Sequence, residues 1–244
     1  MVNIYYDKDA DSKHLKGKTV SIVGYGIQGN AQARNLRDSK VDVLVSELPD
    51  TPQYKQALKD GFKPVGAAEA AKKGDIIQIL TQDDVQAAIY KADIAQHMKK
   101  GKTLMFSHGF NIHYGQIVPP AEIDVIMIAP KGPGHLVRTQ FEIGRGVPAL
   151  IAVYQNSSGK AKDTGLAYAK AIGSTRGGVI ETTFREETLE ISNFRRISRV
   201  YERLESGLHQ RRHPSAEHCL LAEEVSLRLL AERGLDHARS RGAD

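Results

Sequence analysis

The chain has 244 residues, of which 41% are hydrophobic and 26% charged, and it carries a formal net charge of +5 at pH 7. This length suits one domain with an appendage or two small domains, and the single cysteine, Cys219, excludes an intrachain disulfide and a zinc site built on paired cysteines. No apolar run reaches eighteen residues and the first residues are polar, so we expect a soluble cytoplasmic protein with no membrane partner.

Short apolar, β-branched runs alternate with helical patterns from residue 19 to residue 183. This alternation predicts an α/β fold, a Rossmann-like doubly wound and mostly parallel sheet covered by helices. We expect strands at Thr19–Val23, Val41–Val45, Asp75–Leu80, Thr103–Ser107, Val125–Ala129 and Ala149–Tyr154. We expect helices at Gln28–Arg37, Pro52–Asp60, Ala67–Lys73, Asp83–Met98 and Lys160–Ile172. The apolar face of the helix that begins at Asp83 is interpreted as core, not as chemistry.

A glycine-rich turn follows the first expected strand, with Gly24, Gly26 and Gly29 in G-x-G-x-x-G spacing. Gly24 permits the tight turn, Gly26 lets the backbone approach a pyrophosphate, and Gly29 allows close packing of helix and strand. The alternative is that the glycines only make a tight turn, but the surrounding strands favour dinucleotide binding. The predicted cofactor contacts are Gly24, Tyr25, Gly26, Ile27, Gln28 and Gly29.

The loop after the second expected strand, Ser46–Thr51, bears on the choice between NADH and NADPH. A carboxylate such as Glu47 accepts hydrogen bonds from free ribose hydroxyls and repels a 2′-phosphate. The loop therefore favours NADH, with Glu47, Leu48, Asp50 and Thr51 as candidate contacts. Two alternatives stay open: Glu47 and Asp50 are solvated loop acids, or Thr51 and Lys55 hold a phosphate.

The composition changes near Thr188. Residues 1–188 hold 18 Lys and 6 Arg, whereas residues 189–244 hold no Lys and 10 Arg. We expect residues 1–188 to form a dinucleotide-binding domain and residues 189–244 a short helical or partly disordered segment with one amphipathic helix, Ser215–Arg233. Nine acidic residues interrupt these arginines and only Phe194 and Tyr201 could stack on bases, so we predict no nucleic-acid partner.

Four further segments resemble ketol-acid reductoisomerases. They are Phe106–Gln116 (FSHGFNIHYGQ), Val125–Arg138 (VIMIAPKGPGHLVR), Gly144–Ala152 (GRGVPALIA) and Val179–Thr188 (VIETTFREET), and with the glycine loop they extend the resemblance almost continuously from Ile4 to Thr188. The resemblance implies Mg²⁺-dependent alkyl migration and NAD(P)H reduction of 2-acetolactate or 2-aceto-2-hydroxybutyrate to dihydroxy acids. These reactions belong to valine, isoleucine and leucine biosynthesis.

The resemblance also implies roles for individual residues. His108 would lie beside the nicotinamide and handle a proton, and Lys131 would order the water or carboxylates of a metal site, which makes both candidate catalytic residues. Outside this motif, either residue would more commonly be structural. Gly134 would let the backbone approach the cofactor. Leu48 occupies the position of an arginine that contacts the 2′-phosphate in the family, which again weakens NADPH binding.

The resemblance ends where the family places its first metal ligands. Ile191 and Arg195 occupy the positions of the Asp and Glu in the family's T-D-L-F-G-E segment, and neither side chain can ligate Mg²⁺. We therefore predict no metal ligand in this chain, and residues 189–244 do not match the family's helical knotted domain. A reading-frame change, a fusion and a regulatory tail remain alternative origins.

Two functions stay open: an active reductoisomerase with an altered C-terminal region, or a dinucleotide-binding module without catalysis. Formation of a homo-oligomer through Ser215–Arg233 is also open.

Overall fold

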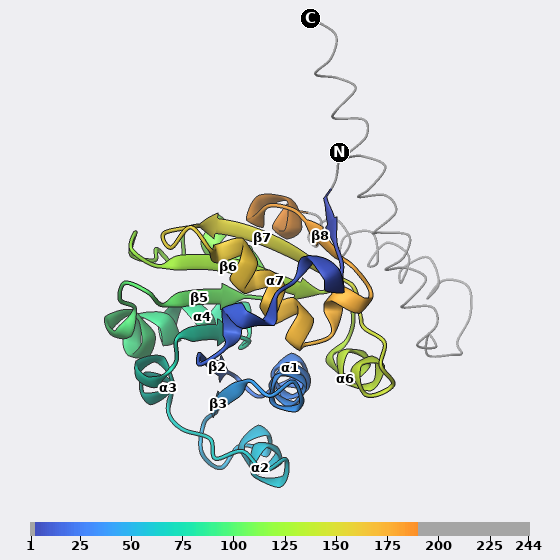
Figure 1. Cartoon of the computed structure of the whole chain (residues 1–244). Helices are drawn as coiled ribbons and strands as arrows, with labels where there is room; N and C mark the ends of the chain where they lie inside the picture. The colour runs from blue at the N-terminus through green and yellow to red at the C-terminus, as the bar shows by residue number, and fades with distance from the viewer. Residues whose placement is uncertain (1–2, 190–244) are drawn as a thin grey trace, which may run out of the picture.

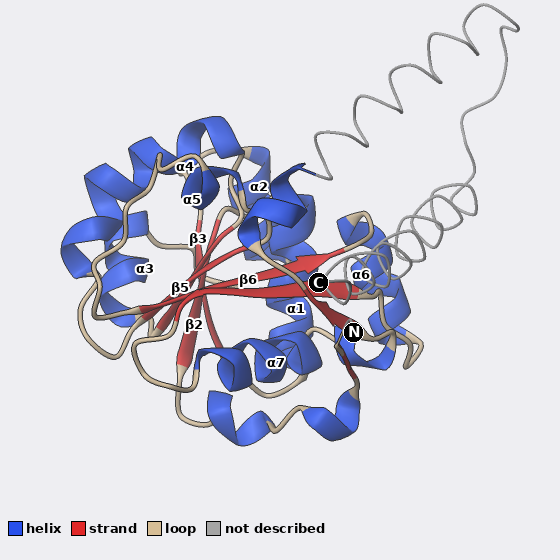
Figure 2. Cartoon of the chain, turned by 90° about the horizontal axis from the view of Figure 1, so that it is seen from above, coloured by secondary structure: helices blue, strands red, loops and turns tan. Residues whose placement is uncertain are grey.

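The computed structural model describes residues 3–189, which form one eight-stranded sheet with helices on both faces (Figures 1 and 2). The strand order is β1-β8-β7-β6-β5-β4-β2-β3. The strands are β1 (Ile4–Tyr5), β2 (Thr19–Val23), β3 (Asp42–Ser46), β4 (Ile76–Ile79), β5 (Thr103–Phe106), β6 (Asp124–Pro130), β7 (Ala149–Gln155) and β8 (Val179–Glu181). The expected helix Ser215–Arg233 and the positions Ile191 and Arg195 lie outside the described residues.

The sheet is mostly parallel, as predicted. Strands β3, β2, β4, β5 and β6 pair in parallel, and so do β7 and β8, whereas β7 runs antiparallel to β6 and β1 runs antiparallel to β8. The carboxyl ends of β2, β4, β5 and β6 therefore meet at one edge of the sheet, which is where doubly wound folds bind their ligands.

The helices are α1 (Ile27–Asp38), α2 (Pro52–Lys59), α3 (Ala67–Lys73), α4 (Asp83–Ile89), α5 (Phe110–His113), α6 (Gly134–Glu142) and α7 (Ala161–Ala171). The helix predicted over Asp83–Met98 is helical as far as His97, but it is not a single α-helix. The α-helix ends at Ile89 and continues as a π-helical turn at Tyr90–Ile94 and a 3₁₀ turn at Ala95–His97. The wider turn keeps both Tyr90 and Ile94 buried in the core.

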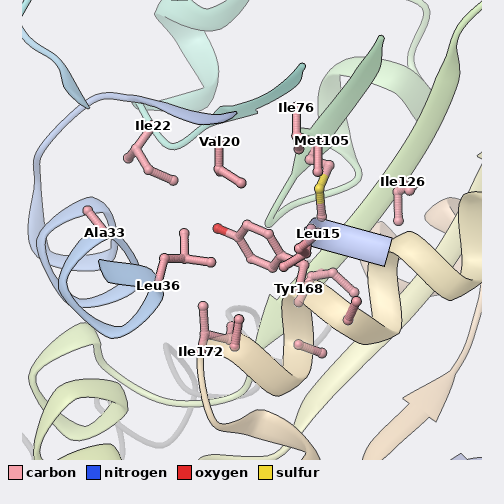
Figure 3. Close-up of a cluster of buried hydrophobic side chains, with 14 of the residues drawn as sticks. Leu15, Val20, Ile22, Ala33, Leu36, Ile76, Met105, Ile126, Tyr168 and Ile172 are labelled. Atoms are coloured by element: carbon pink, nitrogen blue, oxygen red, sulfur yellow. The ribbon is translucent and has the colours of Figure 1, made fainter. Parts of the chain in front are cut away.

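Alternate side chains of the central strands fill two cores, one on each face of the sheet. Ile76 belongs to the core beneath α1 and α7, and the next residue, Ile77, belongs to the core on the opposite face. Figure 3 shows the first of these cores around Tyr168, whose hydroxyl donates to Gln32 Oε1 at 2.7 Å. Burial raises the pKa of Tyr168 above its ordinary value. The hydroxyl therefore stays protonated and remains a donor inside the core.

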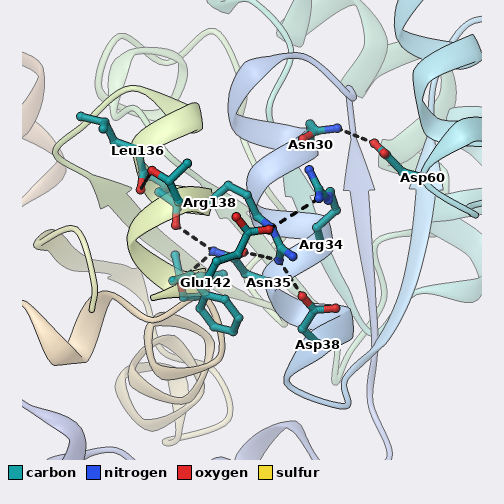
Figure 4. A network of polar contacts seen from close by, with 12 residues as sticks. Asn30, Arg34, Asn35, Asp38, Asp60, Leu136, Arg138 and Glu142 are labelled. Atoms are coloured by element: carbon teal, nitrogen blue, oxygen red, sulfur yellow. Dashed lines mark hydrogen bonds and ion pairs between the residues drawn. The ribbon is translucent and has the colours of Figure 1, made fainter. Parts of the chain in front are cut away.

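A polar network holds α6 beside α1 (Figure 4). Arg138 on α6 donates to Asn35 Oδ1 at 2.9 Å and to Asp38 Oδ2 at 2.7 Å, both on α1. Asn35 in turn donates to the carbonyl oxygen of Val137 at 3.1 Å. Because Asn35 is fully buried and these partners satisfy its polar groups, the two helices keep one relative position. This network places the amino end of α6 against the glycine-rich turn.

Candidate functional site

The glycine-rich turn has the shape that the sequence predicts for a phosphate-binding loop. Gly24 has a φ of 97°, and a Cβ atom there would lie 2.8 Å from Thr81 Cγ2. A Cβ on Gly29 would lie 1.9 Å from the carbonyl oxygen of Gly24, so only glycine allows α1 to pack so closely on the turn. At Gly26, by contrast, a Cβ would meet nothing within 4 Å.

The backbone above Gly26 is therefore open to a ligand. Helix α1 begins at Ile27, and no side chain caps its first turn at Gly26. Its first N–H groups can thus bind an anion, and the helix dipole favours negative charge at this end. These residues fit the pyrophosphate of a dinucleotide. We call Gly24–Gly29 together with Glu47 the dinucleotide cradle.

Glu47 is fixed against the glycine turn. Its Oε2 accepts from the backbone N–H of Tyr25 at 2.7 Å, and its Oε1 accepts from the backbone N–H of Leu48 at 2.9 Å. Glu47 is therefore tied to the loop and does not simply point into solvent. The Glu47 carboxylate is thus held beside the first glycine of the motif. In dinucleotide-binding folds, an acidic side chain at this position lies next to the adenosine ribose.

Beyond Glu47, the loop after β3 is mostly exposed, and it ends in the residue that caps α2. Leu48 is 71% exposed, and Asp50 is also exposed, with a φ of 63°. The Thr51 hydroxyl donates to the carbonyl oxygen of Leu48 at 2.8 Å and accepts from Tyr54 N at 3.0 Å, which makes Thr51 the N-cap of α2. Capping thus gives Thr51 a structural role that is independent of any phosphate.

Two side chains of the predicted cofactor loop face away from the open surface. Tyr25 is buried and donates its hydroxyl to Asp60 Oδ2 at 2.9 Å, and burial together with this bond raises the Tyr25 pKa. Gln28 donates to the carbonyl oxygen of Gly132 at 2.8 Å and links the cradle to the turn after β6. Ile27 is 73% exposed on the open side.

Gly134, a predicted cofactor contact, lies against the cradle itself. A Cβ at Gly134 would come within 2.1 Å of the carbonyl oxygen of Ile27. Glycine is thus required here for the approach of α6 to α1, whatever contact it makes with a cofactor.

A second group of polar residues gathers at the carboxyl edge of the sheet, and we call it the charged cluster: Asp83, His108, Lys131 and Glu187. Asp83 opens α4 after β4, His108 follows β5, Lys131 follows β6, and Glu187 lies in the helical residues 184–189. His108 Nδ1 lies 2.6 Å from Asp83 Oδ2, and Lys131 Nζ lies 3.1 Å from Glu187 Oε1. The two residues predicted to be catalytic, His108 and Lys131, thus lie in one cluster, each in contact with a different carboxylate.

Glu187 is the centre of this cluster. Its side chain is fully buried, and its Oε2 accepts from Gly109 N at 2.8 Å and lies 3.9 Å from His108 Nε2. A Cβ on Gly109 would lie 2.5 Å from the carbonyl oxygen of Phe184, so glycine after His108 allows residues 184–189 to approach. A buried carboxylate needs such compensation by hydrogen bonds and a cation.

Sequence reasoning missed Asp83 and Glu187. Asp83 follows the expected strand Asp75–Leu80 and so lies at the same sheet edge as His108 and Lys131. This position could have identified Asp83, but the helix that begins there was interpreted only as part of the core. Glu187 lies in a segment that resembles the family, but nothing in the local pattern distinguishes it from its neighbour Glu186.

Residues 3–189 contain no group of three or more His, Cys, Asp or Glu side chains that could hold a metal ion. Over the same residues, no helix has the length and apolar character needed to cross a membrane.

Comparison with known proteins gives two kinds of match. The family model of the acetohydroxy acid isomeroreductase NADPH-binding domain matches residues 14–178. The structure of an NADH-preferring ketol-acid reductoisomerase from an uncultured archean is 38% identical, with a TM-score of 0.77 over 94% of this chain and 72% of that chain.

More distant structures share the fold alone. A semialdehyde dehydrogenase NAD-binding protein from Cupriavidus necator, in complex with calcium and NAD, is 21% identical, with a TM-score of 0.64 over 86% of this chain and 82% of that chain. Plasmodium falciparum pyrroline carboxylate reductase with NADP bound is 13% identical, with a TM-score of 0.52 over 89% of this chain and 80% of that chain.

Proposed function

The chain belongs to the ketol-acid reductoisomerase (acetohydroxy acid isomeroreductase) family, and from that premise we propose that it binds NADH in preference to NADPH. The bound cofactor would supply hydride for the reduction of 2-acetolactate or 2-aceto-2-hydroxybutyrate. The observation that carries the cofactor choice is the Glu47 carboxylate, held by the N–H groups of Tyr25 and Leu48. It can accept hydrogen bonds from ribose hydroxyls, and it would repel a 2′-phosphate.

Two regions of the chain would have separate roles, one in cofactor binding and one at the reacting centre. The open backbone at Gly26 and the first turn of α1 would bind the pyrophosphate, and Glu47 would orient the adenosine ribose. His108 would donate or accept a proton beside the reacting carbonyl. The ion pair of Lys131 and Glu187 would hold charged side chains in fixed positions at that end of the site. The proposal is supported by the position of both regions at the carboxyl edge of one sheet.

Magnesium does not fit the described residues. No suitable group of ligands occurs among residues 3–189, and the sequence has Ile191 and Arg195 where the family has metal-binding acids. We therefore derive no step through a metal. This disagreement favours the second candidate function, a module that binds the dinucleotide without catalysis.

A turnover assay tests the proposal and separates the candidates. The full chain is supplied with 2-acetolactate, Mg²⁺ and either NADH or NADPH, and loss of the reduced cofactor is followed by absorbance, with His108→Gln as the matched control. Turnover with NADH that the substitution abolishes supports the enzyme. If neither cofactor is oxidised, even after a separately expressed helical domain from a relative is added, but NADH raises the melting temperature, the chain is a binding module.

A further inference from the structure

His108 meets different environments at its two ring nitrogens. Nδ1 lies 2.6 Å from Asp83 Oδ2, within hydrogen-bond distance. Nε2 is buried and has no hydrogen-bond partner among the residues that the structure describes. The carboxylate of Glu187 is 3.9 Å away from Nε2, too far for a hydrogen bond. A buried polar atom without a hydrogen-bond partner is rare and calls for a physical explanation, of which a catalytic role is one.

The short contact determines which nitrogen carries a proton. A carboxylate offers only acceptor oxygens, so a nitrogen at hydrogen-bond distance from it must be the donor. We propose that Asp83 is a positioning residue that holds a proton on Nδ1 of His108, so that the imidazole gains and loses its exchangeable proton at Nε2, on the side of Glu187. Which nitrogen is protonated is set by the partner of the other nitrogen.

Asp83 is itself held in place by buried amide side chains. Asn111, on α5, donates to the backbone carbonyl of Asp83 at 3.0 Å and to Gln86 Oε1 at 3.1 Å. Gln86 donates to the carbonyl oxygen of Thr81 at 2.8 Å and lies 3.4 Å from Asp83 Oδ1. Gln86 and Asn111 are both buried. The Asp83 carboxylate is therefore fixed relative to the end of β5, where His108 lies.

Glu187 does not compete for the same role. One of its oxygens accepts from Lys131 Nζ at 3.1 Å and the other from Gly109 N at 2.8 Å. Both oxygens thus already have donors, and neither lies within hydrogen-bond distance of the imidazole. The two carboxylates beside His108 are consequently unequal: Asp83 orients the ring, and Glu187 lies opposite the nitrogen that remains without a partner.

The importance of this arrangement for hydride chemistry rests on the proposed function, which places His108 beside the reacting carbonyl. The protonated nitrogen can nevertheless be identified without turnover. A chain with the expected tautomer and no turnover would contradict the proposed function alone. An active chain with the opposite tautomer would contradict this inference alone.

The test is ¹⁵N NMR of the imidazole rings in the full chain labelled at histidine. The chain has nine histidines, and His108→Gln identifies the signals of His108. In the unsubstituted protein, neutral His108 is expected as the Nδ1–H tautomer. The Nε2–H tautomer, or an even mixture of the two, would overturn the proposal, and the tautomer is read from the unsubstituted protein, with His108→Gln used only to assign the signals.

Two matched substitutions sharpen the test. Asp83→Asn replaces the acceptor with an amide that can donate to Nδ1, so the Nε2–H tautomer should become the major form. Asp84→Asn removes the neighbouring, exposed acid in the same first turn of α4 and should leave the His108 spectrum unchanged. An Asp83→Asn protein that folds and keeps the Nδ1–H tautomer would contradict the assignment, as would an equal change in both variants.

Discussion

The dinucleotide cradle and the charged cluster lie at the same edge of the sheet but are built in different ways. The cradle consists mainly of backbone from one short stretch, Gly24–Gly29, to which Glu47 adds one carboxylate. The charged cluster consists of side chains from four separate segments, and Asp83 and Glu187 are 104 residues apart. A backbone site is determined by local glycines, whereas a side-chain site depends on the packing of the whole sheet.

The largest expected effect comes from two glycines of the cradle. Gly29→Ala would place Cβ 1.9 Å from the Gly24 carbonyl oxygen and should destabilise the fold by about 3 kcal/mol, measured by urea unfolding. Gly26→Ala meets no atom within 4 Å, so its stability should be unchanged while NADH no longer raises the melting temperature. Equal stability losses in the two variants would contradict the separation of packing and binding within this loop.

The stability of the charged cluster should depend on the buried carboxylate of Glu187. Glu187→Gln removes the carboxylate that Lys131 contacts, and the free energy of unfolding should fall by about 2 kcal/mol. Lys131→Met removes the other partner, and the double variant should lose less than the sum of the two single losses. Strict additivity would show that the two side chains do not interact. NADH binding at the cradle should change little in all three variants.

As the pH falls, β8 and the segment from Glu181 to Glu187 should lose stability before the dinucleotide cradle does. Burial alone would raise the pKa of Glu181, but hydrogen bonds from Lys162, Tyr5 and Asn3 outweigh it and lower the pKa to about 2. Because the folded-state pKa is depressed, the stabilisation is complete above the ordinary pKa of 4.5 and is lost as the pH falls toward 2.

Hydrogen exchange can follow this loss residue by residue. Protection of the Glu181 amide, which donates to Asn3 O at 3.0 Å, should fall over that pH range, while the Gly24 amide, bonded to Ser46 O at 2.9 Å, keeps its protection. Glu181→Gln should remove the pH dependence at β8. A parallel loss at both amides would indicate global unfolding.

The smallest expected effect concerns Asp50, at the rim of the cradle. Its φ of 63° lies in the left-handed region, which glycine adopts without cost and aspartate only with strain. Asp50→Gly should raise the free energy of unfolding by about 0.5 kcal/mol, because the strain relieved slightly exceeds the entropy that glycine loses. Asp50→Ala should give no gain. Weaker NADH binding in Asp50→Gly would identify Asp50 as a cofactor contact.

The sequence was sufficient to predict the central strands and the fold class, because buried β-branched runs between helices leave few alternatives. It did not indicate β1 and β8, which are two and three residues long and are defined by their pairing. It also missed α5 and α6: α5 follows Gly109 and has only four residues, and α6 begins at Gly134, so neither start carries a strong helix signal.

The residues of the candidate site also differ in whether a local sequence pattern could predict them. The glycine turn and Glu47 could be predicted because their spacing along the chain determines their geometry. Lys131 and His108 were found only through the resemblance. Asp83 and Glu187 were missed because their roles arise when β4, β5, β6 and residues 184–189 come together, and no local pattern encodes that contact.

The central claim is that Glu47 makes the cradle a site for NADH, and isothermal titration calorimetry of the full chain with NADH and NADPH tests it most directly. We predict that NADH binds at least tenfold more tightly, about 1.4 kcal/mol in binding free energy, because NADPH brings its 2′-phosphate to a fixed carboxylate. Glu47→Gln should reduce that ratio. Equal affinities, or tighter binding of NADPH, would contradict the account.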